Sequence, residues 1–142
     1  MYSREESKMI RQQFWTSFGK EYPKKWLLYN TRIKDFSLKF TFTRKMAEVS
    51  IDLDSPDEIM RGYYFEKLQS LQTILKDEYL PEAKFSEAYQ LENGKLISRV
   101  YVRLEGVNIH NQKDWPEVKR WLAEKMTPLE SFFIEYRDFI QQ

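Results

Sequence analysis

Two stretches of the chain alternate strictly between apolar and polar residues. Residues 36–42 place an apolar side chain at every second position, and residues 47–53 repeat the pattern. This period of two predicts two strands that each bury one face. A turn at Arg44-Lys45 sets every apolar residue of one strand opposite an apolar residue of the other, in the pairs Phe36–Leu53, Leu38–Ile51, Phe40–Val49 and Phe42–Ala47. Because this turn contains no Gly or Asn, a longer loop with the register shifted by two residues stays open.

A second hairpin is indicated by Asn93-Gly94, which lies between two further alternating stretches. This dipeptide favours a two-residue turn, which pairs Glu92 with Lys95 and Leu91 with Leu96. The second strand of this hairpin has two distinct faces. We expect the core face to hold Leu96, Val100, Val102 and Leu104, and the opposite face to hold Ile97, Arg99, Tyr101 and Arg103.

Apolar residues at helical spacing predict a helix at each end of the chain. The first runs from about residue 4 to residue 19, and Ser3 and Glu6 form a capping box at its start. The last begins near Trp115, and Thr127-Pro128 indicates that it bends or restarts there.

A middle helix is predicted from about residue 56 to residue 79, with Ser55 as its N-cap and Pro56 at its first position. Residues 24–35 form either a short helix or an irregular crossing. The resulting order is helix, hairpin, helix, hairpin, helix. We therefore expect one α+β domain over residues 1–142, a four-stranded antiparallel sheet with helices packed mainly on one face.

The amino-acid composition excludes several classes of protein. There is no cysteine, which excludes thiolate zinc sites and disulfides. There is neither a secretory leader nor an apolar stretch of membrane-spanning length, so we expect a cytoplasmic protein. The net charge of +1 does not by itself predict a nucleic-acid partner. Residues 1–50 nevertheless hold 11 Lys or Arg against 5 Asp or Glu, which permits a basic patch in that half.

The letters of Asp57, Glu82 and Lys84 match the PD-(D/E)xK pattern of Mg²⁺-dependent nucleases. In such a site Asp52 or Asp54, at a strand end, fits better than Asp57. The segment Ser55 to Glu58 is fully explained as a helix start, so we expect these acids and Lys84 not to converge. We predict no cofactor and no bound metal.

A row of Arg99, Tyr101 and Arg103 lies on the predicted non-core face of the sheet, and Lys39 lies on the same face. Such a row can bind nucleic acid through stacking and phosphate contacts. It can equally pair with Glu48, Asp52 or Glu92 across the sheet, or pack beneath the last helix, and we favour these structural roles. The single histidine, His110, is expected in a solvated loop.

Several aromatic markers resemble one uncharacterised bacterial family. They are "RQQFWTSF" at residues 11–18, Trp26 shortly after it, "YYFEKLQSL" at residues 63–71 and "KDWPEVKRWL" at residues 113–122. The family is domain of unknown function 4268. The resemblance implies a stand-alone protein or a C-terminal module behind a nuclease-like segment, and it supplies no catalytic residues. Because the chain starts with Met and its own capping box, we expect it to be complete.

The function expected from these observations is that of a non-enzymatic binding or accessory module. Its expected context is nucleic-acid processing or phage defence. Two alternatives stay open: the Mg²⁺-dependent nuclease, and direct nucleic-acid binding through the basic N-terminal half or the Arg99–Tyr101–Arg103 row. The aromatic content also leaves room for a protein partner or a homodimer.

Overall fold

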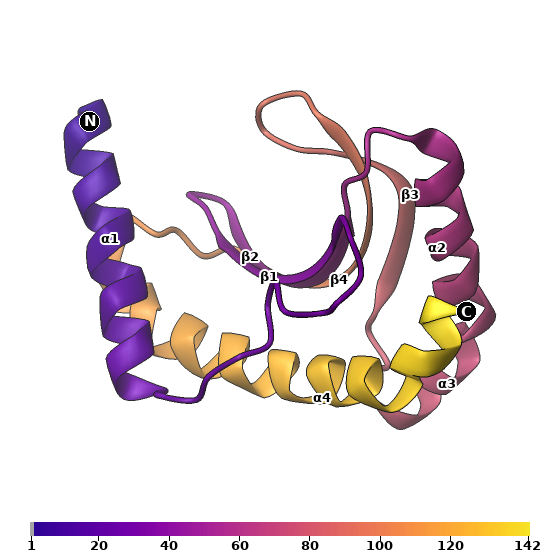
Figure 1. Cartoon of the computed structure of the whole chain (residues 1–142). Helices are drawn as coiled ribbons and strands as arrows, with labels where there is room; N and C mark the ends of the chain where they lie inside the picture. Colours follow the sequence, from indigo (N-terminus) through magenta and orange to yellow (C-terminus); the bar gives the residue numbers. More distant parts are fainter. Residues whose placement is uncertain (1) are drawn as a thin grey trace.

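The computed structural model describes residues 2–142, which form an α+β fold with four antiparallel strands in one open sheet and four helices. Figure 1 shows α4 beneath the sheet, α1 at one side, and α2 and α3 at the other. Two helices, rather than the single one expected, connect the hairpins. The elements in chain order are α1 (Arg4–Glu21), β1 (Phe36–Phe42), β2 (Met46–Leu53), α2 (Glu58–Ser70), α3 (Gln72–Glu78), β3 (Lys84–Gln90), β4 (Leu96–Glu105), the 3-10 helix η1 (Gln112–Asp114) and α4 (Trp115–Gln141).

The first hairpin has the predicted register, and all four apolar pairs expected between β1 and β2 are present. Its turn is held by Thr43, whose N–H donates to the Met46 carbonyl at 2.8 Å. The Thr43 hydroxyl accepts from the N–H of Lys45 at 3.1 Å. The threonine side chain therefore stabilises a tight turn without Gly or Asn.

The strand order is β1-β2-β4-β3, so the two hairpins join through β2 and β4. The predicted pairing of Leu91 with Leu96 is wrong. Gln90 pairs with Leu96, and the Leu91 N–H donates to the Lys95 carbonyl at 2.9 Å. Gly94 has a φ of +88°, and a loop of three residues with glycine in this left-handed region replaces the expected two-residue turn.

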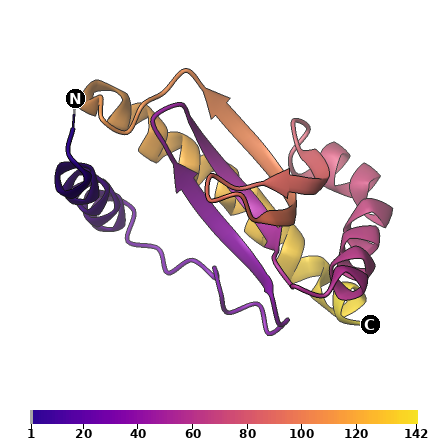
Figure 2. The same ribbon diagram turned by 90° about the horizontal axis from the view of Figure 1, so that it is seen from above.

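A β-bulge between Ser86 and Tyr89 bends the second hairpin. The end of this hairpin arches over the face of the sheet that α4 does not cover (Figures 1 and 2). The prediction that Leu96 belongs to the core is wrong as a result, whereas Ile97 lies on the opposite face as expected but is buried there. Leu96 is 53% exposed rather than in the core, and Ile97 on the other face is only 1% exposed.

The hydrophobic core lies between α4 and the apolar face of the sheet. Val49 and Ile51 of β2 are completely buried, as are Leu122 and Met126 of α4. Burying a side chain of this size contributes about 1.5–3 kcal/mol. None of the helices in residues 2–142 is long and apolar enough to span a membrane.

An aromatic cluster fastens α1 to this core. The Phe14 ring lies 4.8 Å from that of Phe42 on β1 and 5.3 Å from that of Trp115 on α4, both edge to face. The predicted capping box is confirmed, because the Glu6 N–H donates to Ser3 Oγ and the Ser3 N–H donates to Glu6 Oε1. The start of α1 is thereby fixed beside the turn between β1 and β2.

The middle helix differs from its prediction in two respects: it is broken into two helices, and it has a different N-cap residue. It breaks at Leu71, whose N–H donates to the Leu68 carbonyl at 3.0 Å, three residues back. Its N-cap is Asp57 rather than Ser55, because Asp57 Oδ1 accepts from the Ile59 N–H at 2.9 Å. A carboxylate at this position also interacts favourably with the positive end of the helix dipole.

The last helix, α4, continues through Pro128 without the restart that the sequence indicated. The Thr127 hydroxyl donates to the Ala123 carbonyl at 2.8 Å in the turn that the proline enters. Residues 24–35 form the irregular crossing, with φ values of +48° at Leu28 and +66° at Arg32. Glu130 of α4 holds this crossing by accepting from the Leu27 N–H at 2.7 Å.

Candidate functional site

The sheet face opposite α4 carries a buried ionic network. Arg99 is only 2% exposed, and it donates from Nε and Nη2 to both oxygens of Asp52 at 2.7 Å. Its Nη1 donates to Glu48 Oε1 at 2.8 Å. Glu48 is completely buried and Asp52 is 5% exposed. The prediction that this arginine pairs with acids across the sheet is confirmed.

Arg103 and Tyr89 complete the network at its edge. Arg103 Nε donates to Glu48 Oε2 at 2.6 Å, and the Tyr89 hydroxyl donates to the same oxygen at 2.8 Å. Burial and the hydrogen bond to Glu48 raise the pKa of Tyr89 above its usual value. For Arg99, burial alone would lower the pKa, but Asp52 and Glu48 outweigh it and raise it. The network thus pairs two arginines with two carboxylates.

The remaining members of the predicted binding row have looser surroundings. Tyr101 is partly exposed, and the Arg103 guanidinium lies 5.1 Å from its ring centre. Lys39 is exposed on β1 and lies opposite Ser50. The residues of the predicted binding row therefore differ: Arg99 is ion-paired with carboxylates, whereas the side chain of Lys39 is accessible to solvent or a ligand.

The candidate nuclease residues have separate partners. Asp52 is held by Arg99, and Asp54 lies 4.0 Å from the Lys95 ammonium. Strand β4 separates β2 from β3, the strand that begins at Lys84. Within residues 2–142 no three His, Cys, Asp or Glu side chains are grouped so as to hold a metal ion.

Glu82 faces α4 instead of the other acids, and its Oε1 lies 2.7 Å from the ammonium of Lys125. Partial burial of Glu82 would raise its pKa, but the hydrogen bond from Lys125 outweighs this and lowers the pKa below the usual value. Glu82 therefore acts as a partner for α4.

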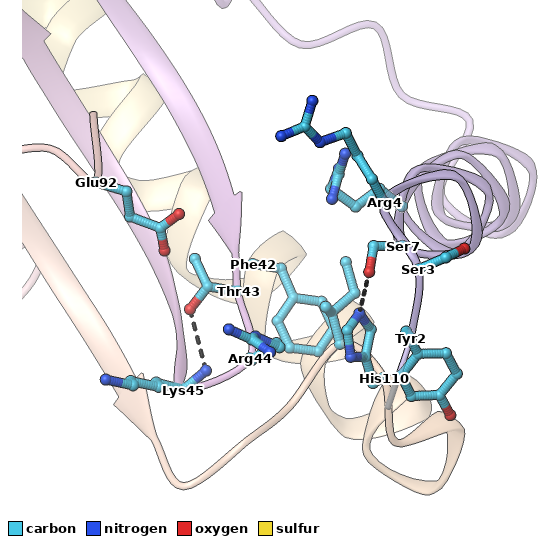
Figure 3. Close-up of a pocket in the computed structure, with 12 residues that line it drawn as sticks. Tyr2, Ser3, Arg4, Ser7, Phe42, Thr43, Arg44, Lys45, Glu92 and His110 are labelled. Carbon is cyan, nitrogen blue, oxygen red and sulfur yellow. Dashed lines mark hydrogen bonds between the residues drawn. The ribbon is translucent and has the colours of Figure 1, made fainter.

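A pocket of about 570 Å³ opens between the start of α1, the β1–β2 turn and the loop before η1 (Figure 3). We call it the basic pocket, since most of the polar side chains that line it are cations or neutral hydrogen-bond donors. Glu92, its only carboxylate, lies across the opening from Arg4 and Ser7. The residues that define the basic pocket here are Arg4, Ser7, Arg11, Arg44, Lys45 and His110.

Two local structures supply the four cations of the basic pocket. Arg4 and Arg11 are seven residues apart on α1, which places them on the same helix face. Arg44 and Lys45 project from the turn that Thr43 stabilises. No Asp or Glu in residues 2–142 comes within ion-pair distance of any of these four side chains.

His110 lies in a loop, as expected, and its partly exposed side chain forms one wall of the basic pocket. Its Nε2 lies 3.3 Å from Ser7 Oγ, and its ring centre lies 4.3 Å from that of Tyr2 (Figure 3). The His110 N–H donates to Asn108 Oδ1 at 2.8 Å, which fixes the loop. These contacts hold the start of α1 against the loop and so set the width of the opening.

Sequence reasoning did not identify the basic pocket. Its only advance signal was the excess of Lys and Arg in residues 1–50. Nothing in the local patterns shows that Arg4 and Arg11 meet Arg44 and Lys45, since about 35 residues of chain separate the two pairs.

The fold and the pocket together define a small α+β domain with an open, cation-lined cavity at the end of its first hairpin. Residues 10–137 match the model of the family described as Domain of unknown function (DUF4268), and the chain belongs to that family. Neither a curated protein nor a solved structure shows a significant match to the chain. The matched range includes Arg11, Arg44, Lys45 and His110 but not Arg4.

Proposed function

We propose that this protein is a non-enzymatic binding module that holds the phosphate groups of a nucleic acid in the basic pocket. The observation that carries the proposal is the gathering of four cations around one cavity whose single described carboxylate, Glu92, lies beyond ion-pair distance of them all: Arg4, Arg11, Arg44 and Lys45. Clustered cations attract phosphates and release the counterions condensed on a nucleic acid, which favours binding. A phosphodiester chain is the biological anion best suited to several separated cations at once.

Repulsion among the four cations supports a binding role over a purely structural one. Like charges around a shared cavity disfavour the folded state, and an incoming anion relieves that repulsion. The ionic network of Arg99, Glu48 and Asp52 has the opposite character, because its charges are already satisfied within the protein. The nucleic acid is therefore assigned to the basic pocket, and the buried arginine to the stability of the sheet.

The wider setting follows the expectation from the family. We infer an accessory role beside nucleic-acid-processing or phage-defence proteins in the bacterial cytoplasm. A nuclease activity of this chain has less support, because Glu82 is paired with Lys125 and β4 lies between the strands that carry Asp52 and Lys84. A homodimer is compatible with this role.

Fluorescence anisotropy with a labelled 20-nucleotide DNA tests the proposal. We expect wild type to bind at low salt. The variant Arg11→Glu/Arg44→Glu should lose at least about tenfold in affinity, because it reverses two of the phosphate-contacting charges. The matched control is Lys76→Glu/Arg120→Glu, which makes the same charge change outside the pocket and should stay near wild type.

Two results would overturn the proposal. One is a wild type that binds no nucleic acid at low salt, and the other is an equal loss in both double variants. A plasmid assay covers the alternative activity. Cleavage by wild type in Mg²⁺ that is abolished in Glu82→Ala would replace the proposed role with that of a nuclease.

A further inference from the structure

Two further hollows continue the basic pocket along β1. The middle one has a volume of about 540 Å³ and shares Phe42, Thr43 and Glu92 with the basic pocket. The outer one has a volume of about 190 Å³ and shares Trp15, Lys39 and Phe40 with the middle one. Because each hollow shares wall residues with the next, the three lie side by side along β1, and we call this row of hollows the β1 groove.

The β1 groove is long enough for a chain rather than a single small anion. It follows β1, whose seven residues span roughly 23 Å at about 3.3 Å per residue. Its available cations are those of the basic pocket at one end and Lys39, which lines both the middle and the outer hollow, while Glu92 lines both the basic pocket and the middle hollow. A ligand with regularly spaced negative charges matches this arrangement.

Aromatic side chains line the part of the groove beyond the basic pocket. Trp15 lines both the middle and the outer hollow and is partly exposed. Tyr29 lines the outer hollow and is 77% exposed, which is unusual for a tyrosine without a role at the surface. The preceding Leu28, with its φ of +48°, belongs to the tight crossing that presents this ring. Nucleobases stack on rings of this kind.

A buried hydroxyl in the middle hollow has no partner. Thr41 Oγ1 is shielded from solvent and makes no hydrogen bond within residues 2–142, and other atoms of Thr41 line the hollow. A hydroxyl can both donate and accept, so a base edge or a sugar oxygen can satisfy it once the threonine side chain turns toward the hollow. An unsatisfied buried hydroxyl costs free energy, and this cost favours a ligand that carries polar atoms as well as charge.

We propose that the β1 groove binds a single-stranded nucleic acid, with bases against Trp15 and Tyr29 and phosphates at Lys39 and in the basic pocket. The inference rests on the proposed function and adds the class of nucleic acid. In a duplex the bases stack on one another, and their faces are not available to side chains. The end of the β3–β4 hairpin lies over the sheet (Figure 2). It contributes Asn93 to the wall of the middle hollow, which suits a thin strand.

A comparison of three ligands tests the inference: a labelled 12-nucleotide strand, the same strand annealed to its complement, and an abasic strand of equal length. We expect the intact strand to bind at least about tenfold more tightly than the other two, because only it offers free base faces. Tyr29→Ala should weaken intact-strand binding at least about fivefold, the low end for one stacked base. Tyr63→Ala, which removes an exposed tyrosine of α2, should leave binding unchanged.

The outcomes separate this inference from the proposed function. Equal binding of all three ligands, with Tyr29→Ala unaffected and Arg11→Glu/Arg44→Glu impaired, would overturn the inference and leave phosphate binding intact. Absence of binding to every nucleic acid would overturn both. Competition by polyglutamate as effective as that by the intact strand would also overturn the inference, because it would show a general preference for acidic chains.

Discussion

Replacing Arg99 with methionine tests the assignment of the sheet's open face to stability. The side chain is 2% exposed and makes three hydrogen bonds of 2.7–2.8 Å to Asp52 and Glu48. Arg99→Met keeps most of the buried volume but leaves Asp52 with only the Ser50 hydroxyl as a side-chain donor. Removing one partner of a buried ion pair costs about 3–5 kcal/mol, because the charge that stays behind is uncompensated.

This cost is large compared with the total stability of roughly 5–15 kcal/mol expected for a domain. Urea unfolding followed by the fluorescence of the four tryptophans measures it, and the midpoints are compared only if the slopes agree. Arg103→Met is the matched control. Its side chain is 30% exposed, and Glu48 would keep two other donors, so about 1.5 kcal/mol is expected. The reasoning is refuted if Arg99→Met costs less than the control.

Three further substitutions test single contacts. Because the pKa of Glu82 is lowered in the folded state, its pairing with Lys125 stabilises the protein above about pH 4.5 and less as the pH falls through the folded pKa. Urea titrations of Glu82→Gln should therefore show a free energy of unfolding lower by about 0.5 kcal/mol at pH 7, the size expected for an exposed ion pair. This difference should disappear in acid, and a difference that does not depend on pH would contradict the reasoning. Asp57→Ala should cost about 1 kcal/mol through the lost N-cap and lower the midpoint of thermal unfolding. Gly94→Ala should destabilise the protein by at least about 1 kcal/mol, because residue 94 has a positive φ. Gly19→Ala, inside α1, should instead stabilise the protein by up to about 1 kcal/mol. Equal effects of the two substitutions would contradict the assigned turn.

The part of the fold that the sequence predicted well is the part fixed by alternation. Phe36 to Phe42 and Ala47 to Leu53 admit one parity that buries both apolar sets, and the observed register follows it. The second hairpin was one residue off because Gly94 supports a three-residue loop as readily as a two-residue turn. A local motif constrains loop length less strongly than a buried face constrains register.

The middle helix shows a second limit of local reasoning. The helical spacing of apolar residues continues across Leu71, so the sequence did not indicate the break there. At its start, Ser55 and Asp57 are both good N-cap residues, and which of them caps the helix more favourably depends on the path of the chain after β2. The carboxylate of Asp57 is the acceptor that the backbone N–H groups meet.

The candidate site was predictable only in outline. Pairing of Arg99 with acids across the sheet could be foreseen, because strand alternation puts all of them on one face. The basic pocket could not, because it depends on how α1 packs against the end of the first hairpin. That packing is set by Phe14 against Phe42 and Trp115, contacts between residues far apart in the chain.

The salt dependence of DNA binding is the most direct test of the central claim, that the basic pocket holds nucleic-acid phosphates. The four cations of the basic pocket, each displacing one counterion from a single strand, contribute about −2.8 to the slope of log K against log salt concentration, and Lys39 of the β1 groove adds about −0.7. Arg11→Glu/Arg44→Glu should reduce the magnitude of the slope by about 1.4 or more, since two of the four contacts in the basic pocket are lost. A wild-type slope near zero, or a slope that this double variant leaves unchanged, would contradict the account.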